Sequence, residues 1–219
     1  MGMIPGRESL DFGWETTKKY LGFFIVISII VLLAQIVPRS LQNVAAEDVL
    51  ILAFLIGFAG WVIQKIIDMG FIKICLKCCD NEKGEFSDLI PTSSQRVINF
   101  ILGSIIYGVI VTVGTILLIV PGIIWSLKFQ FFGYFIIDEG LGPIDALKKS
   151  GMITKGVKGN LFVFALVIVL INIVGMLLLL VGLFVTIPLT TLAFSYMYRS
   201  LLKRNEGVAI PENFDISFR

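Results

Sequence analysis

The charged side chain that lies deepest in an apolar stretch of this 219-residue chain is Lys128. It follows the break at Pro121-Gly122 by roughly 9 Å of helix, at 1.5 Å per residue. A charge at that depth costs about 2.5–3.5 kcal/mol on insertion scales, so it usually faces protein or water. Two interpretations follow. Lys128 binds an anionic ligand or lipid in a cavity with Trp125 and Gln130 nearby, or its long stem carries the ammonium to the membrane interface.

A second basic group lies between two apolar stretches. Gly142 can begin a helix there, Pro143 suits its first turn, and Ile144, Leu147 and Gly151 would share one face. The pattern predicts a short helix on the membrane surface. Its lysines either hold anionic lipid head groups, at about 1 kcal/mol each, or only fix topology and depth. The candidate contacts for anionic lipid or ligand are Lys128, Lys148, Lys149 and Lys155.

Few residues suggest catalysis or metal binding. The chain has no histidine, which removes the commonest general base and metal ligand. Its three cysteines, Cys75, Cys78 and Cys79, are too few for a structural zinc site of four good ligands. No HExxH, no GxSxG and no aspartate pair within an apolar stretch is present. We therefore expect no catalytic, metal-binding or cofactor-binding residues, no cofactor, and a protein that is not an enzyme.

The composition is that of a membrane protein. Hydrophobic residues make up 57% of the chain and charged residues 16%, and the mean hydropathy is +0.93. Soluble domains carry about 25% charged residues. This low charge content, together with several apolar runs of about 20 residues, predicts an all-α, polytopic membrane protein.

Six transmembrane helices are expected, arranged as three hairpins with short interfacial helices. The first is stopped by Pro38, and the second continues as helix towards Lys77. Breaks at Pro121-Gly122 and Val181-Gly182 would force antiparallel hairpins. The expected spans are 20–37, 49–67, 97–120, 123–137, 160–180 and 183–202.

Basic residues predict the orientation. With the N-terminus inside, only Arg39 lies outside, which satisfies the positive-inside rule. We therefore expect both termini in the cytoplasm and a multi-pass protein of the cell inner membrane. A single six-span domain would occupy 1–203, followed by a cytoplasmic tail, 204–219.

A weak internal repeat accompanies these spans. The stretch 117–123, LLIVPGI, matches 177–183, LLLLVGL, and each hairpin follows a segment with one aspartate: Asp11, Asp88 or Asp145. The pattern predicts three units, each a surface segment followed by a hairpin. Such repeats occur in transporters and also serve as a fold device.

Several stretches resemble one bacterial membrane-protein superfamily: GWETTKKYLGFF near the start, EFSDL at 85–89, LLIVPGI at 117–123 and DEGLGPIDALKKS at 138–150. That superfamily includes the membrane domains fused to glycerophosphoryl diester phosphodiesterases and stand-alone proteins of unknown function. The resemblance is strongest from about 85 to 200 and implies a six-span helical membrane domain without an assigned reaction. The chain lacks the soluble phosphodiesterase domain, and it has Gly151 where the resemblance leads us to expect tryptophan.

Two functions remain open. The first is a lipid-interacting or accessory scaffold without catalysis, and the second is a small-solute transporter or exporter subunit. A polar-lined cavity would favour transport, and a solid apolar core would favour the scaffold. Membrane lipids, a second copy or a partner membrane protein are the expected partners, with no nucleic acid. Lys65 and Asp68 are expected to form an interfacial ion pair, and hydrogen bonds between helices are expected from Gln64, Asn99, Tyr107, Asn172 and Tyr196.

Overall fold

The computed structural model describes residues 5–46, 50–178 and 182–205, which contain helices and no strand. This confirms the all-α prediction. The elements in chain order are α1 (Gly6–Lys19), α2 (Leu21–Ala46), α3 (Leu50–Cys79), the short 3-10 helix η1 (Phe86–Leu89), α4 (Ser94–Leu117), α5 (Ile119–Phe129), α6 (Phe132–Glu139), α7 (Pro143–Ile153), α8 (Lys158–Leu177) and α9 (Leu183–Asn205).

Five helical stretches in the described part of the chain are long and apolar enough to cross a membrane: Leu21–Gln42, Ile51–Cys79, Ser94–Leu117, Ile119–Glu139 and Lys158–Leu177. The sixth expected span corresponds to α9, which is helical but does not reach that apolar content. Six spans, the hairpin arrangement, the orientation of the termini and the 1–203 domain therefore stay predictions. The tail beyond 205 and Val181 of the expected second break lie outside the described residues.

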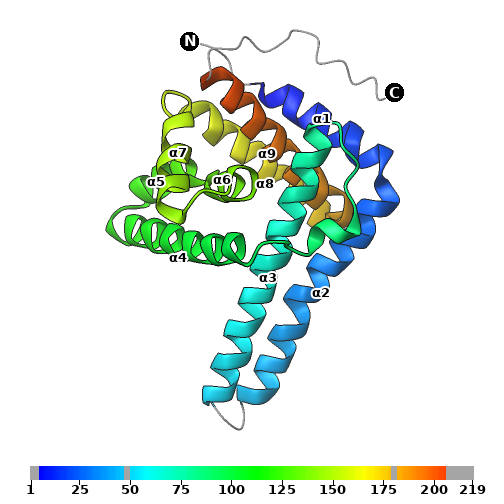
Figure 1. Cartoon of the computed structure of the whole chain (residues 1–219), viewed down its shortest axis with the longest axis vertical. Helices are drawn as coiled ribbons and strands as arrows, with labels where there is room; N and C mark the ends of the chain where they lie inside the picture. The colour runs from blue at the N-terminus through cyan, green and yellow to red at the C-terminus, as the bar shows by residue number, and fades with distance from the viewer. Residues whose placement is uncertain (1–4, 47–49, 179–181, 206–219) are drawn as a thin grey trace.

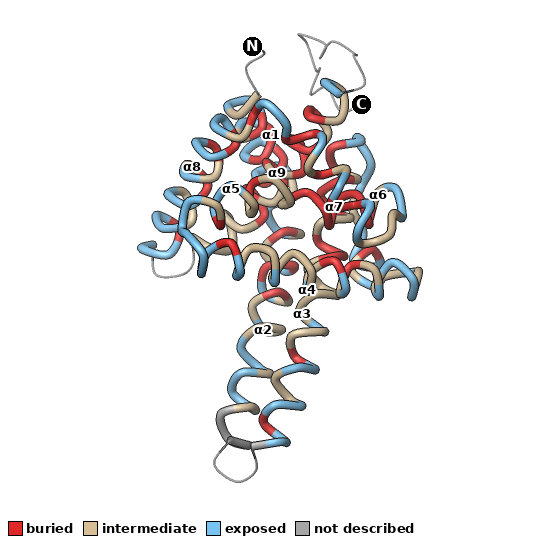
Figure 2. The backbone as a smooth tube through the Cα atoms, turned by 90° about the vertical axis from the view of Figure 1, so that its left-hand side faces the viewer, coloured by how far each residue is buried: buried red, intermediate tan, exposed pale blue. Residues whose placement is uncertain are grey.

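The pair α2–α3 extends away from the rest of the molecule (Figure 1). Its far turns are mostly exposed or half-buried, whereas the buried residues gather in the opposite half of the molecule (Figure 2). The expectation that Pro38 stops the first helix is wrong, because α2 continues through it to Ala46. A Cβ at Gly60 of α3 would lie 2.2 Å from the Pro38 Cβ, so α3 packs directly on the proline ring. This contact supports the helix where the proline removes a backbone donor.

The turn between α4 and α5 lies earlier than the sequence predicts. Leu118, not Pro121-Gly122, has the extended backbone that separates the helices. Pro121 lies in the first turn of α5, where a missing N–H leaves no helical bond unmade. Gly122 allows close contact with α4, since a Cβ there would lie 2.3 Å from the Thr115 hydroxyl oxygen.

The span expected at 123–137 is two helices rather than one, because α5 ends at Phe129 and α6 begins at Phe132. Two buried hydroxyls of the α7 region bond the backbone at this break. The Ser150 hydroxyl accepts from the Phe131 N–H at 3.1 Å and donates to the Lys128 carbonyl at 2.9 Å. The Thr154 hydroxyl donates to the same carbonyl at 3.1 Å. In an apolar environment such bonds allow a helix to be interrupted.

A helix does follow Gly142 as predicted, α7, with Gly142 as N-cap and Pro143 in its first turn, and its position on a membrane surface stays a prediction. Its buried face differs from the expected one. Leu147 is buried, but Ile144 is exposed, and the side buried against the protein is formed by Ala146, Leu147, Ser150 and Ile153. The reason is that Ser150 must reach the α5–α6 break, which rotates Ile144 outward.

Helix α9 is the element around which the others pack, and it contacts α1, α2, α3, α7 and α8. Near its end, Arg199 donates to both Asp138 oxygens, at 2.6 and 3.0 Å, and to Asp80 at 2.5 Å. Tyr198 donates to Asp138 at 3.1 Å. Charge-assisted bonds of this kind join the end of α3, the end of α6 and α9.

The three aspartates of the predicted repeat have different surroundings. Asp88 of η1 is buried and pairs with Lys73 at 2.9 Å and Lys77 at 2.8 Å. Asp11 and Asp145 are exposed. A short segment does precede α2–α3, α4–α5 and α8–α9 in the chain order, but the repeat itself stays a prediction.

Replacing Gly13 tests the packing of α1 on α9. An alanine Cβ would lie 2.5 Å from the Leu189 carbonyl oxygen, so Gly13→Ala should lower the unfolding free energy by about 1–3 kcal/mol. Gly22→Ala is the control, because nothing lies within 4 Å of its Cβ and alanine favours a helix. Thermal unfolding in one detergent measures both, and equal midpoints would contradict the packing.

The Asp88 ion pairs predict a dependence of stability on pH. Burial raises the pKa of Asp88, but Lys77, Lys73 and the Glu85 N–H outweigh burial and lower it from 3.8 to about 2. A lowered carboxyl pKa stabilises the fold above 3.8, and that contribution disappears as the pH falls towards 2. The unfolding midpoint of the wild type should therefore fall in this window more steeply than that of Asp88→Asn. Parallel pH curves would show that the ion pairs do not stabilise the fold.

Candidate functional site

A cavity of about 550 Å³ lies between α3, α4, α6, α8 and α9. Aromatic rings form much of its wall: Trp61, Phe71, Phe100, Tyr107, Phe132, Tyr134 and Phe194. Polar side chains lie among them: Lys65, Asp68, Ser104, Gln130, Asn172, Thr190 and Thr191. Its size and its mainly apolar lining with a few polar groups are typical of small-molecule sites.

An ion pair on α3 is the charged part of this wall. The Lys65 ammonium lies 2.8 Å from one Asp68 oxygen, and the Gln64 amide donates to the other at 2.8 Å. The predicted pair is therefore confirmed, but it lines a cavity rather than only marking an interface. The signal available in the sequence was Lys65 and Asp68, two opposite charges in the middle of the 30-residue, mainly apolar α3.

The other polar groups of the wall differ in which hydrogen bonds they can still form with a ligand. Ser104 donates to the Phe100 carbonyl, Asn172 to that of Ile168, and Thr190 and Thr191 to that of Ile187. Their oxygens can still accept hydrogen bonds. The buried side-chain nitrogen of Gln130 has no hydrogen-bond partner among the described residues. The wall thus offers several acceptors and the unpartnered Gln130 amide donor to a ligand.

Hydrogen bonds between helices are present for part of the predicted set. Tyr107 of α4 donates to the Ser126 carbonyl of α5 at 3.3 Å, whereas Asn99 of α4 donates to the carbonyl of Leu141, in the loop between α6 and α7, also at 3.3 Å. Gln64 and Asn172 bond within their own helices instead. Tyr196 stacks on Phe12 with ring centroids 5.0 Å apart.

Lys128 lies beside α7 and is not part of the wall of this cavity. Its ammonium is 4.8 Å from the centre of the Phe129 ring, and a Cβ at Gly151 would lie 3.0 Å from the Lys128 Cε. Gln130 does line the cavity, whereas Trp125 packs against Gly114. The space that a tryptophan at 151 would need is therefore filled by the Lys128 stem. Lipid binding by Lys128 stays a prediction.

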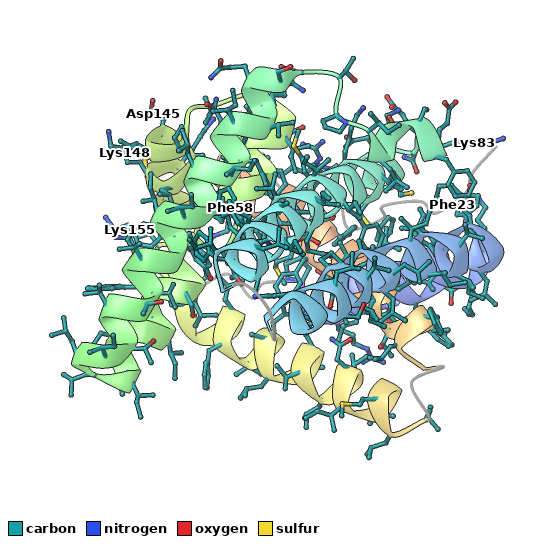
Figure 3. The ribbon with its side chains drawn as sticks, turned by 90° about the horizontal axis from the view of Figure 1, so that it is seen from below. Phe23, Phe58, Lys83, Asp145, Lys148 and Lys155 are labelled. Carbon is teal, nitrogen blue, oxygen red and sulfur yellow. The ribbon has the colours of Figure 1, made fainter. Side chains whose placement is uncertain are left out.

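The remaining candidate lysines do not converge on the cavity. Figure 3 shows Lys148 and Lys155 at one edge of the molecule together with Asp145. Lys148 pairs loosely with Asp145 at 3.5 Å, and Lys149 pairs with Glu139. Lys155 is exposed and forms no ion pair within the described part of the chain. The four candidates thus form no single site, and lipid contact by each stays a prediction.

The cysteine cluster belongs to the core. Cys75, Cys78 and Cys79 are free thiols, each at most 5% exposed, and they pack with Phe24, Phe71 and Leu192. Within the described ranges no group of three or more histidine, cysteine, aspartate or glutamate side chains could hold a metal ion.

The five apolar helical stretches of spanning length in the described residues indicate a helical, multi-pass membrane protein. The chain belongs to the family described as a domain of unknown function, DUF7847, which matches residues 86–204. That range nearly coincides with the region of strongest resemblance in the sequence. Membership of the wider superfamily that contains phosphodiesterase-fused membrane domains stays a prediction.

One relative is the uncharacterized protein Rv2560 of Mycobacterium tuberculosis, 29% identical over 126 residues. The similarity covers 57% of this chain and 38% of that protein, so the chain spans well under half of the relative's length. No solved structure matches the chain.

Removing one partner of the ion pair tests its place in the wall. Asp68→Asn leaves the Lys65 ammonium without a counter-charge, so we expect a loss of about 1 kcal/mol in unfolding free energy. The double variant Lys65→Met/Asp68→Asn should recover part of it, because no lone charge remains. Lys148→Met, from the exposed pair with Asp145, is the control and should change little. Thermal unfolding measures all three, and a double variant less stable than Asp68→Asn would contradict this account.

Proposed function

We propose that this chain is a non-catalytic integral membrane protein that binds membrane lipid in the cavity between α3, α4, α6, α8 and α9. The observation that carries the proposal is a wall that combines seven aromatic rings with an ion pair and an unused amide donor. Such a wall suits a molecule with an apolar chain and a polar group, as a lipid has. The bilayer would supply this ligand directly.

The apolar surface of the molecule supports a position within a bilayer. Large hydrophobic side chains are exposed along four helices: Val26, Ile29 and Leu33 of α2; Ile51, Phe54 and Phe58 of α3; Leu102, Ile105 and Val109 of α4; and Val163, Leu166 and Leu170 of α8. An exposed apolar surface of this extent is typical of a membrane-embedded protein. We propose six spans in three hairpins, both termini in the cytoplasm and residence in the inner membrane, from the distribution of basic residues.

The state of the cavity hydroxyls supports a role without catalysis. Each of Ser104, Thr190 and Thr191 donates its proton to a carbonyl of its own helix, so none is bonded to a base that could activate it. Asp68 is already bonded by Lys65 and Gln64. These groups can position a ligand by accepting hydrogen bonds.

A small-solute transporter is the second candidate, and the α5–α6 break favours it. Interrupted helices that expose backbone groups near a binding site are common in transporters. Gln130, within that break, contributes the unused donor to the wall. Under this alternative the Lys65–Asp68 pair would contact the solute.

Filling the cavity tests lipid binding. Asn172→Phe places an aromatic ring inside the cavity, so the purified protein should retain fewer lipid molecules. Native mass spectrometry counts the lipid molecules that stay bound. The variant should also gain less thermal stability from added lipid. Val169→Phe, on the exposed face of the same helix, is the matched control and should behave as the wild type. Equal lipid retention by both variants would contradict lipid binding in the cavity.

If the cavity is instead a solute pathway, a cysteine in its wall should be reachable from water. Ser104→Cys in proteoliposomes would then react with a membrane-impermeant maleimide, against a low background because the three native cysteines are buried. A lipid-filled cavity predicts no reaction, together with quenching of a fluorophore at position 104 by brominated acyl chains.

A further inference from the structure

A second cavity of about 450 Å³ lies between α1 and α8, at the end of the molecule where the described chain begins. Leu10 of α1, Val163, Phe164 and Val167 of α8, and Met197 of α9 form its apolar wall. None of its lining residues lines the first cavity. We call this space the α1–α8 groove.

Polar groups occur only at the start of the two helices that border the groove. They are Arg7 of α1 and Asn160 of α8, both exposed. Within the described residues Arg7 forms no ion pair, although Asp11 follows it by one helical turn. At the other end of α1, by contrast, Lys18 pairs with Glu15 at 2.7 Å. Arg7 therefore has its guanidinium available for an anion.

More positive charge lies in the turn that leads into α8. Lys155 lies in this turn, Lys158 is the first residue of α8, and a Cβ at Gly156 would lie 3.9 Å from a guanidinium nitrogen of Arg204. No ion pair is formed by any of these three cations within the described part of the chain. They lie at the end of α8 from which Asn160 lines the groove, and Arg7 is the charged residue of the groove lining itself.

The apolar wall continues along α8. Val163 of the groove is followed on the same helix by exposed Leu166, Leu170 and Ile173, which repeat at three- and four-residue spacing. This stripe would face acyl chains if Lys158–Leu177 spans the bilayer. A chain lying along the stripe would reach the groove at the level of Arg7.

We propose that the α1–α8 groove binds an acyl chain of an anionic phospholipid, with Arg7 holding the phosphate of its head group. The Arg7 guanidinium selects for anionic lipids, and the apolar wall favours a ligand with an acyl chain over free phosphate or a soluble anion. The proposal deepens the lipid-binding function and rests on it only for the position of the chain in a bilayer. It names a different site and a lipid class.

The test uses the full chain in nanodiscs of phosphatidylcholine with and without phosphatidylglycerol. After the protein is released from the nanodiscs, native mass spectrometry measures which lipids stay bound to it. The wild type should retain phosphatidylglycerol in preference to phosphatidylcholine, and Arg7→Gln should reduce this preference about five-fold, the effect of one basic residue near a charged surface. Lys18→Gln removes the same charge from the same helix and should leave the preference unchanged. Equal preferences in Arg7→Gln and Lys18→Gln would overturn the proposal.

Filling the groove gives an independent readout. A Cβ at Gly6 would lie 3.6 Å from a Phe164 ring carbon, an ordinary contact, so Gly6→Ala should retain lipid. Gly6→Leu should release the retained phosphatidylglycerol while keeping the wild-type unfolding midpoint in detergent. Retention of phosphatidylglycerol by a folded Gly6→Leu would overturn the proposal. If Gly6→Leu unfolds, the Arg7→Gln comparison decides the question.

Two further comparisons separate the alternatives. Deleting residues 1–4 should leave retention unchanged, and a gain would mean that the start of the chain occupies the groove, which would overturn the proposal. If Arg7→Gln has no effect but Asn172→Phe loses lipid, the groove proposal fails and the proposed function stands. If Asn172→Phe has no effect but Arg7→Gln reduces the lipid preference, the proposed lipid binding in the first cavity fails and the groove proposal stands.

Discussion

The structure depends on how backbone hydrogen bonds are satisfied at a break inside an apolar segment. The candidate span Ile119–Glu139 is interrupted between Phe129 and Phe132, where backbone groups lose their helical partners. In a bilayer each unsatisfied group would cost several kcal/mol. Ser150 and Thr154, both fully buried, supply the missing partners from the α7 region. The short helix α7 is therefore fixed on the protein and is more than a passive surface element.

The break has consequences for both sides of α7. On the inner side it allows Gln130 and Phe132 to join the cavity wall, next to rings from α4 and α9. On the other side Lys128 lies against Gly151, and Asp145 and Lys148 of α7 lie at the edge of the molecule (Figure 3). One set of hydrogen bonds thus separates a partly polar cavity from a basic surface. This separation explains why the polar residues of the cavity wall and the candidate lysines lie in different places.

Charge pairs outside the cavity hold the surrounding helices. Arg199 joins the ends of α3 and α6 to α9, and Asp88 joins η1 to α3 through two lysines. Both networks lie beyond the most apolar parts of the helices, where a paired charge costs less to bury. Within α3, Lys65 and Asp68 are paired with each other and lie in the cavity wall. These charges are thus neutralised locally, whereas Lys128 and Arg7 form no ion pair within the described residues, and the unpaired Arg7 of the α1–α8 groove motivates an anionic lipid there.

The all-helical fold, the extension of α3 beyond its apolar core, and the start of α7 at Gly142-Pro143 could be predicted from the amino-acid sequence. These features follow from apolar periodicity and capping residues, which act over a few neighbouring positions. Tertiary packing decided that α2 continues through Pro38, that the chain turns at Leu118, and that Ser150 of α7 bonds the backbone at a break in the candidate span Ile119–Glu139. It also decided that Lys65, Asp68 and Gln130, and not Lys128, line the cavity. Each of these outcomes rests on contacts between distant segments, such as Gly60 with Pro38 and Ser150 with Phe131, and local patterns carry no information about such partners.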